Sequence, residues 1–166
     1  MQIHKLTTRY EVQKLNETDI EAIYELMQGN PLFFQHCPPM ATHQSILSDM
    51  KALPPGTTEK DKYYIGYFEQ GYLVAVMDLI LNFPNEETAF IGFFMLDNKL
   101  QGEGIGTEIF KECCIALQEE GYRYIRLGFA KGNPQSEAFW KKNGFERTGV
   151  EDVQENYTVV LMERRL

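Results

Sequence analysis

Leu100-Gln101-Gly102-Glu103-Gly104-Ile105-Gly106-Thr107 is the stretch that decides the fold of this chain. It follows an almost wholly apolar segment, residues 88–96, and precedes apolar residues at helical spacing from Ile105 onward. Glycines in such a turn let the backbone approach a ligand and point its N–H groups inward. The start of the helix adds unsatisfied donors and a positive dipole end. This turn is therefore typical of a pyrophosphate site.

Two other phosphate-binding motifs do not fit the turn. A dinucleotide fingerprint needs Gly or Ala at position 107 or 109, depending on where it starts, and the sequence has Thr107 and Ile109. A Walker A loop needs a Gly-Lys-Ser/Thr triplet, which the sequence lacks. Taken alone, the stretch leaves one alternative open, a glycine-rich connection that binds nothing.

Hydrophobic patterning predicts a mixed sheet that alternates with helices. The expected strands are 2–15, 62–68, 72–81, 88–96, 124–129, 145–150 and 157–162, and the expected helices lie within 18–29, 42–53, 104–121 and 133–143. The strand–helix–strand unit over 88–129 calls for a parallel, right-handed crossover, while the hairpins around it are antiparallel. The predicted fold class is thus α/β with a mixed sheet of six or seven strands.

Local signals set several of these boundaries. Thr18-Asp19-Ile20-Glu21 has the pattern of a capping box, and Gly121 that of a glycine ending a helix. Asn133-Pro134 predicts an N-cap followed by proline in the first helical turn. Residues 30–39, rich in aromatics and prolines, are expected to form a loop that either covers the core or lines a substrate pocket.

A second motif stands 32 positions after Gln101, at Asn133-Pro134-Gln135-Ser136-Glu137-Ala138-Phe139-Trp140-Lys141-Lys142-Asn143-Gly144-Phe145. The two stretches, in this order, resemble motifs A and B of the GNAT acetyltransferase superfamily. The resemblance covers residues 62–150 well and the first sixty residues only by element order. It implies a single N-acetyltransferase domain over residues 1–166, with the GNAT-like fold of six to seven strands flanked by about four helices.

The resemblance also implies acetyl-CoA as co-substrate and a set of residues that bind it. Backbone amides would hold the pyrophosphate at Gln101, Gly102, Glu103, Gly104, Ile105, Gly106 and Thr107. The pantetheine arm would pair with the backbone of Phe94, Met95 and Leu96, as an added strand would, and Asn133 and Phe139 would line its other side. Lys99, Lys131 and Lys142 are either partners of the 3′-phosphate or solvated surface charges.

Asp78 is the best candidate for a catalytic base. It is the one charged residue in Leu73–Leu81, and a carboxylate in a buried strand is costly unless it is paired or functional. A structural, hydrogen-bonded Asp78 stays open as the alternative, and Glu86 and Glu87 are expected in a solvated turn. Where the family has a tyrosine as general acid, this chain has Trp140, so either water, Tyr64 or Tyr157 would protonate the thiolate, or the step needs no acid.

Function follows from these residues as an expectation. The chain is predicted to transfer an acetyl group to a primary amine of a small molecule or peptide, with Phe33, Phe34, His36 and Tyr64 lining the acceptor pocket. A catalytically weak acyl-CoA-binding or sensing module remains the alternative, because no clear acid–base pair is visible. A nucleotide-dependent enzyme that uses the same turn is a third hypothesis.

Composition excludes several partners. A formal net charge of −8 without a Lys/Arg stripe argues against nucleic acid and suits a cationic substrate. No stretch approaches the roughly 20 apolar residues of a membrane span, so a cytoplasmic protein is expected. Three cysteines without ligand-like spacing predict buried thiols and no metal site. The sequence leaves the oligomeric state open, a homodimer included.

Overall fold

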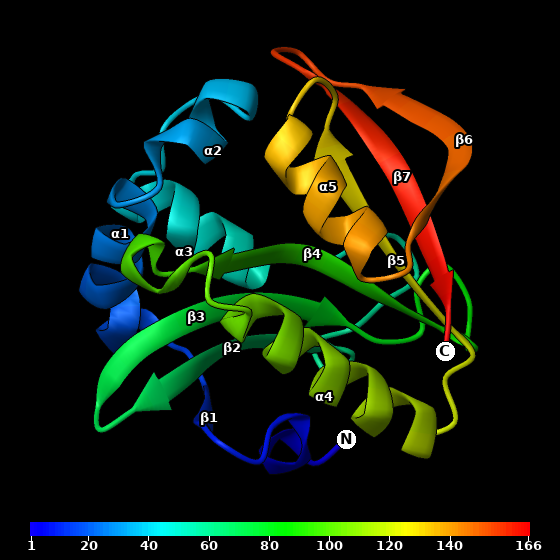
Figure 1. The fold of residues 1–166 in the computed structure, drawn as a ribbon, viewed down its shortest axis with the longest axis horizontal. Helices are drawn as coiled ribbons and strands as arrows, with labels where there is room; N and C mark the ends of the chain where they lie inside the picture. The colour runs from blue at the N-terminus through cyan, green and yellow to red at the C-terminus, as the bar shows by residue number, and fades with distance from the viewer.

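The computed structural model describes residues 1–166, and its framework is one seven-stranded mixed sheet with the strand order β1-β2-β3-β4-β5-β7-β6 (Figure 1). The strands are β1 (Glu11–Lys14), β2 (Lys62–Glu69), β3 (Tyr72–Ile80), β4 (Thr88–Leu96), β5 (Tyr124–Ala130), β6 (Glu146–Val153) and β7 (Thr158–Arg165). Only β4 and β5 are parallel neighbours, and every other pair is antiparallel. The predicted α/β class and mixed sheet are confirmed.

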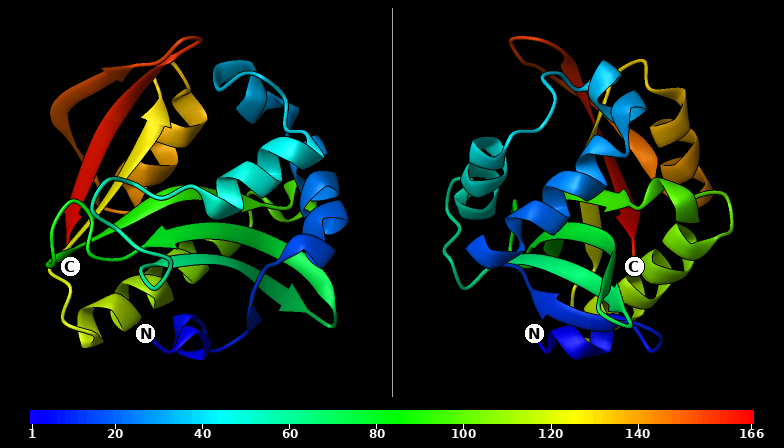
Figure 2. Two further views of the ribbon diagram at one scale, coloured as in Figure 1. Left: turned by 180° about the vertical axis from the view of Figure 1, so that it is seen from behind. Right: turned by 90° about the vertical axis from the view of Figure 1, so that its left-hand side faces the viewer.

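Five helices cover the two faces of this sheet. They are α1 (Ile20–Gln28), α2 (Pro31–His36), α3 (His43–Lys51), α4 (Ile105–Glu119) and α5 (Pro134–Lys142). The side view of Figure 2 shows α1, α2 and α3 on one side of the sheet and α4 and α5 on the other. Each side buries its own hydrophobic cluster, of 27 residues under α4 and α5 and of 10 residues under α1 and α3. Burial on both faces explains why the central strands read as apolar runs.

The sheet opens where β4 and β5 diverge. The two strands pair only over Thr88–Ile91 and Tyr124–Leu127, and beyond those residues β4 has no partner on that side. Figure 1 shows β5, β7 and β6 rising steeply away from β2, β3 and β4. The second half of β4 therefore presents an unpaired sheet edge, which normally invites another chain or an extended ligand.

The N-terminal segment differs from its prediction. Residues 2–15 do not form one strand: Ile3–Leu6 is a short 3₁₀ helix, and β1 begins only at Glu11. Leu6 is fully buried in the cluster beneath α4, against which the 3₁₀ helix packs. The alternation of apolar residues thus came from two different elements.

The capping box predicted at Thr18–Glu21 is also wrong. The box lies two residues earlier, where the Asn16 side chain accepts from the N–H of Thr18 and the Asp19 carboxylate accepts from the N–H of Asn16. Residues 16–19 and 18–21 both begin with a short polar residue and end with an acid. The capping box forms at Asn16 because a 3₁₀ turn precedes α1. The cap predicted at Asn133 is present, and the side chain of Thr42 caps α3.

Residues 30–39 are not wholly a loop, because they contain α2, a fifth helix where about four were expected. Pro31 occupies the first helical position, where its missing N–H costs nothing. With only six residues, this helix lacks the length that makes helical periodicity visible in a sequence. It nevertheless places Phe33 and Phe34 against the sheet, and Phe33 makes an edge-to-face contact with Phe93 of β4.

Candidate active site

A bulge in β4 faces the opening of the sheet. The register between β3 and β4 shifts at Asp78, so that Phe93 pairs with Asp78, Ile91 pairs with Leu79, and Gly92 is left between them. A Cβ atom on Gly92 would lie 2.7 Å from the Asp78 carboxylate. Only glycine therefore allows the Asp78 side chain to pack this closely against the β4 backbone.

The edge of β4 beyond the bulge offers backbone groups to the opening. Asp97 donates its N–H to the carbonyl of Val74, and hydrogen-bonded pairs alternate along an antiparallel ladder. Met95 therefore bonds toward β3, while the N–H and C=O groups of Phe94 and Leu96 turn toward the gap. The Leu96 carbonyl accepts from the side chains of Asn30 and Gln101 there, both at 3.2 Å.

The glycine-rich turn after β4 has the form of an anion cradle. Gly102 and Gly104 have φ values of +85° and +83°, and nothing lies within 4 Å of where a Cβ atom would stand on either residue. The N–H groups of residues 102–107 make no hydrogen bond within the protein. Six free donors at the start of a 15-residue helix fit a pyrophosphate, and the space beside Gly102 and Gly104 is open.

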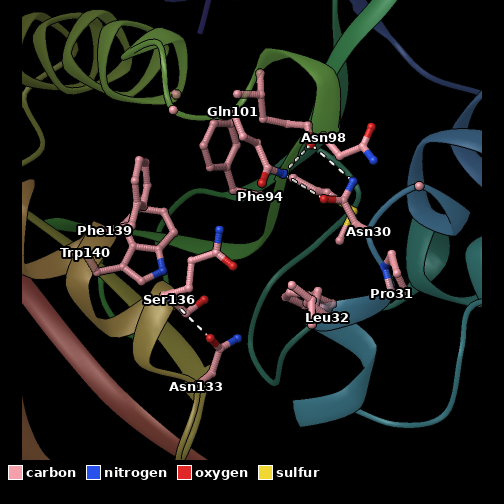
Figure 3. Close-up of a pocket in the computed structure, with 17 residues that line it drawn as sticks. Asn30, Pro31, Leu32, Phe94, Asn98, Gln101, Asn133, Ser136, Phe139 and Trp140 are labelled. Atoms are coloured by element: carbon pink, nitrogen blue, oxygen red, sulfur yellow. Dashed lines mark hydrogen bonds between the residues drawn. The ribbon is translucent and has the colours of Figure 1, made fainter.

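The side chain of Gln101 fixes this turn in place. Its amide nitrogen donates to the Asn30 side-chain oxygen at 2.7 Å (Figure 3). The Asn30 amide in turn donates to the carbonyl of Leu26 at 2.9 Å. The backbone N–H of Gln101 is itself engaged, with the carbonyl of Asn98 at 3.4 Å. Asn30, buried at the end of α1, thereby ties the turn to the opposite face of the sheet.

Next to the turn lies a first cavity of about 440 Å³, between the end of β4, α5 and α2 (Figure 3). Of the residues predicted to bind the coenzyme, those that line it are Phe94, Met95, Leu96, Gln101, Gly102, Gly106, Asn133 and Phe139. The remaining four, Glu103, Gly104, Ile105 and Thr107, belong to the turn but not to the cavity wall. Ile105 in particular points into the core.

A second cavity, of about 660 Å³, lies on the other side of the same opening. Its wall is mostly apolar and comes from α2, α3, the central strands, β5 and the residues after β6. Of the residues predicted to line an acceptor pocket, Phe33, Phe34 and Tyr64 line this cavity, whereas His36 lines neither cavity. Asp78 also lines it, while Glu86 and Glu87 are exposed in the turn before β4.

Asp78 is paired inside the second cavity. One of its carboxylate oxygens accepts from the Lys62 ammonium at 2.9 Å, with only 10% of the Asp78 and 6% of the Lys62 side chain exposed. Its other oxygen, Oδ1, is buried without a partner, as is the Tyr64 hydroxyl. Burial raises the pKa of Asp78 above its ordinary value, and Lys62 opposes that rise. Burial likewise raises the pKa of Tyr64.

The two cavities share four lining residues, Phe33, Phe94, Ser136 and Trp140. Trp140 is buried at this junction and makes edge-to-face contacts with the rings of Phe110, Phe139 and Phe145. Its indole therefore serves as a wall that two cavities have in common. A ligand in the first cavity and one in the second would meet at these residues.

Tyr157 supplies a hydroxyl near this site, on the second cavity wall. The neighbouring Cys37 thiol, together with burial, raises the pKa of Tyr157 to about 12. A phenol with this pKa stays protonated at neutral pH and is a weaker acid than an ordinary tyrosine.

Sequence reasoning missed several residues of the site. Asp49 and Lys62 line the second cavity, and Asn30 and Ser136 line the first. Asp49 stands one helical turn after Ser45, which also lines the cavity, so the spacing on α3 was a usable signal. Lys62 opens a strand, and nothing in its neighbourhood distinguishes it from a surface lysine.

The three lysines considered for a phosphate are exposed. Lys131 forms an ion pair with Glu151 at 2.7 Å, whereas Lys99 and Lys142 have no ion-pair partner. No group of three or more His, Cys, Asp or Glu side chains is arranged to hold a metal ion. No helix of the chain has both the length and the apolar character needed to cross a membrane.

The chain matches a known family. The profile of the Acetyltransferase (GNAT) family matches residues 20–145, so the chain belongs to that family. The sequence-based assignment is thus confirmed. Among curated proteins, none matches the sequence significantly.

Solved structures show the same fold at low sequence identity. An acetyltransferase from Thermus thermophilus is 18% identical, with a TM-score of 0.76 and coverage of 96% of this chain and 99% of that one. A Salmonella typhimurium acetyltransferase that modifies the N-terminal serine of ribosomal protein L7/L12 is also 18% identical, with a TM-score of 0.76 and 97% coverage of both chains.

A third structure contains a ligand. The PaiA N-acetyltransferase from Thermoplasma acidophilum, in complex with coenzyme A, is 18% identical, with a TM-score of 0.68 and coverage of 96% of this chain and 100% of that one. Similarity at this level establishes the fold.

Proposed function

We propose that this protein is an N-acetyltransferase that transfers the acetyl group of acetyl-CoA to a primary amine in a ternary complex. The observation that carries the proposal is the row of six free N–H groups at residues 102–107, beside a cavity that meets a second, charged cavity at Trp140. A donor site and an acceptor site that share a wall suit direct transfer. Membership of the acetyltransferase family supports this activity.

Coenzyme A would lie along the first cavity. Its pyrophosphate would accept hydrogen bonds from the free amides of residues 102–107. Its pantetheine arm would add to the β4 edge, where register turns the backbone groups of Phe94 and Leu96 outward. Asn133 and Phe139, from the start and the middle of α5, line the other side of this cavity. We thus retain the predicted coenzyme residues as a proposal.

The reaction needs a neutral amine, whereas a free alkyl amine has a pKa of about 10.4. Asp78 would accept the proton on its unpartnered oxygen Oδ1, directly or through water, while Lys62 keeps the other oxygen bonded. As the nitrogen–carbon bond forms and the carbon–sulfur bond breaks, charge develops on the carbonyl oxygen. The N–H of Phe94 or Leu96 can stabilise that charge, because both face the gap.

The leaving thiolate must regain a proton. Trp140 cannot supply it, because an indole N–H is not an acid near neutral pH. Tyr157 is the better donor, since it lines the second cavity and stays protonated at neutral pH. Tyr64 also lines that cavity and has a free hydroxyl. We assign the acid role to Tyr157, or to water that it orients.

The test combines binding with turnover. Acetyl-CoA, NAD and ATP are titrated separately in calorimetry, and thiol release from acetyl-CoA is then followed with a panel of primary amines. We expect binding of acetyl-CoA alone, and a loss of about 100-fold in kcat for Asp78→Asn at unchanged coenzyme affinity. Binding of ATP or NAD in place of acetyl-CoA would overturn the coenzyme assignment. Full turnover by Asp78→Asn would remove Asp78 from the reaction.

A catalytically weak acyl-CoA-binding module is the second candidate. Two observations favour it: Trp140 stands at the junction of the cavities, and the proposed base is already held by Lys62. It predicts acetyl-CoA binding without thiol release on any amine of the panel, whereas the transferase predicts release with at least one.

A further inference from the structure

The second cavity has an unbalanced charge. Among the side chains that line it, only Asp49, Lys62 and Asp78 carry a formal charge, so two carboxylates and one ammonium leave a net charge of −1. Lys62 is within salt-bridge distance of Asp78 alone, and the Asp49 side chain makes no hydrogen bond or ion pair. One positive charge is missing from this arrangement.

Asp49 is an exposed residue of α3 that lines the same cavity as the buried pair of Lys62 and Asp78. Burial raises the pKa of Asp49, and the nearby Lys62 ammonium opposes that rise. Burial is the largest cause of the raised pKa of Tyr64, and the Asp49 carboxylate raises that pKa further. It contributes in the same direction at Asp78. The Asp49 charge therefore acts on the interior of the cavity.

Two buried polar atoms of this cavity also have no partner. They are Asp78 Oδ1, in a side chain that is nine-tenths buried, and the hydroxyl of Tyr64, a residue only 6% exposed. Buried polar atoms are normally hydrogen-bonded, so each exception calls for an explanation. An N–H donor of a bound molecule would satisfy Asp78 Oδ1, and the same molecule would supply the missing positive charge.

The rest of the wall carries no further charge and is mostly apolar, although Ser45, Ser136 and Tyr157 contribute hydroxyl groups. Its apolar part includes Pro38, Met40, Ile80, Phe90 and Phe129, and no residue of the remaining wall offers a counter-ion. A second ammonium group, or a carboxylate, would be desolvated there without a partner, which is strongly unfavourable. The volume of about 660 Å³ lies within the usual range of small-molecule pockets.

We infer that the acceptor is a small primary amine with one positive charge and an apolar body, and that Asp49 holds its ammonium group beside Asp78. This inference rests on the proposed transferase function and specifies its substrate. The ammonium and Lys62 together balance Asp49 and Asp78. Asp78 Oδ1 then receives the proton that the nitrogen loses before it attacks the thioester carbonyl.

The experiment compares amines that differ in charge. 2-Phenylethylamine, 1,4-diaminobutane and phenylalanine are assayed with acetyl-CoA, and their binding to the coenzyme-loaded protein is measured by calorimetry. We expect 2-phenylethylamine to be preferred by at least about tenfold, and 2-phenylethanol, its analogue without the ammonium, to bind at least about tenfold more weakly. Equal use of the diamine or the amino acid, or equal binding of the alcohol, would overturn the inference.

Asp49→Asn tests the assigned residue. It should raise the KM for 2-phenylethylamine about tenfold, while kcat and coenzyme affinity change little. This loss lies between that expected for an exposed ion pair and that expected for a charged hydrogen bond. Asp152→Asn, on the exposed strand β6, is the matched control and should change neither constant. An unchanged KM in Asp49→Asn would refute the role of Asp49.

The two proposals fail in different ways. Loss of acetyl-CoA binding by the wild-type protein would refute the transferase. Coenzyme binding and amine turnover without the expected charge preference would refute only the acceptor class. Should Asp49→Asn not fold, the comparison of 2-phenylethylamine with 2-phenylethanol on the wild-type protein decides the matter.

Discussion

The two cavities that meet at Trp140 are built in different ways. The first takes most of its lining residues from two short stretches, 94–107 and 133–140, and lies beside the free backbone N–H groups of residues 102–107. The second gathers side chains from at least six elements spread over residues 27–159. Backbone recognition needs only the right turn, whereas side-chain recognition needs a whole fold. The sequence therefore allows the first cavity to be predicted, but not the second.

Gly104→Val tests recognition by the backbone of the glycine-rich turn, and its effect on acetyl-CoA affinity should be the largest of the series. Its φ of +83° excludes a β-branched residue, and the new side chain would enter the space in front of the free amides. We expect acetyl-CoA affinity to fall about 10²- to 10⁴-fold, the loss of two charged hydrogen bonds, as measured by calorimetry. Gly149→Val, at a φ of +87° and with open space around it, imposes the same strain far from the site. Equal losses in both variants would mean that strain alone, and not the cradle, explains the result.

Lys62→Met tests the side-chain half. It leaves Asp78 buried without its cation, which should destabilise the fold by about 3–5 kcal/mol. The pKa of Asp78, already raised by burial, should rise further because Lys62 opposes that rise. The acidic limb of kcat/KM should then move to higher pH. A carboxyl whose folded pKa is raised loses stabilisation as pH rises through that pKa, so the variant should also unfold more easily at pH 8 than at pH 5.

If the acidic limb of kcat/KM in Lys62→Met stayed at the wild-type pH, that limb would not report on the ionisation of Asp78. Lys60→Met, in the preceding turn, removes the same charge from an exposed position and should shift neither the limb nor the unfolding.

Trp140→Phe tests the wall that the cavities share. The smaller ring loses part of its contacts with Phe110, Phe139 and Phe145, so we expect a loss of about 1–3 kcal/mol in the free energy of unfolding. Turnover should stay close to the wild-type value, because the indole has no proton to give. A well-folded variant with collapsed kcat would instead assign Trp140 a role in the reaction.

Phe34→Ala and Phe33→Ala test whether the two cavities bind different ligands. Their effects on the amine KM and on acetyl-CoA affinity should be the smallest of the series. Phe34 lines only the second cavity, so its removal should raise the amine KM several-fold and leave acetyl-CoA affinity unchanged. Phe33 lines both, and its removal should change both constants. The opposite pattern, with coenzyme affinity sensitive to Phe34, would place the boundary between the cavities elsewhere.

Sequence signals predicted the elements that carry a strong local pattern. The bounds of β4 agree with the prediction, and Asn133 caps α5 as expected, because a buried strand and a capped helix leave their pattern in neighbouring residues. Short elements left too little pattern: Ile3–Leu6 and α2 are each six residues or fewer. Their conformation follows from what they pack against, and a sequence does not display that.

The same division holds for the site. By itself, the sequence determined a glycine-rich turn that opens a helix, and hence a family, since both the free amides and the left-handed glycines come from consecutive residues. Only the tertiary structure decided that Asp78 is bonded to Lys62, that Asp49 from α3 faces the same cavity, and that His36 does not line it. Those facts depend on how β2, β3 and α3 are packed together, because charges act through space and not along the chain.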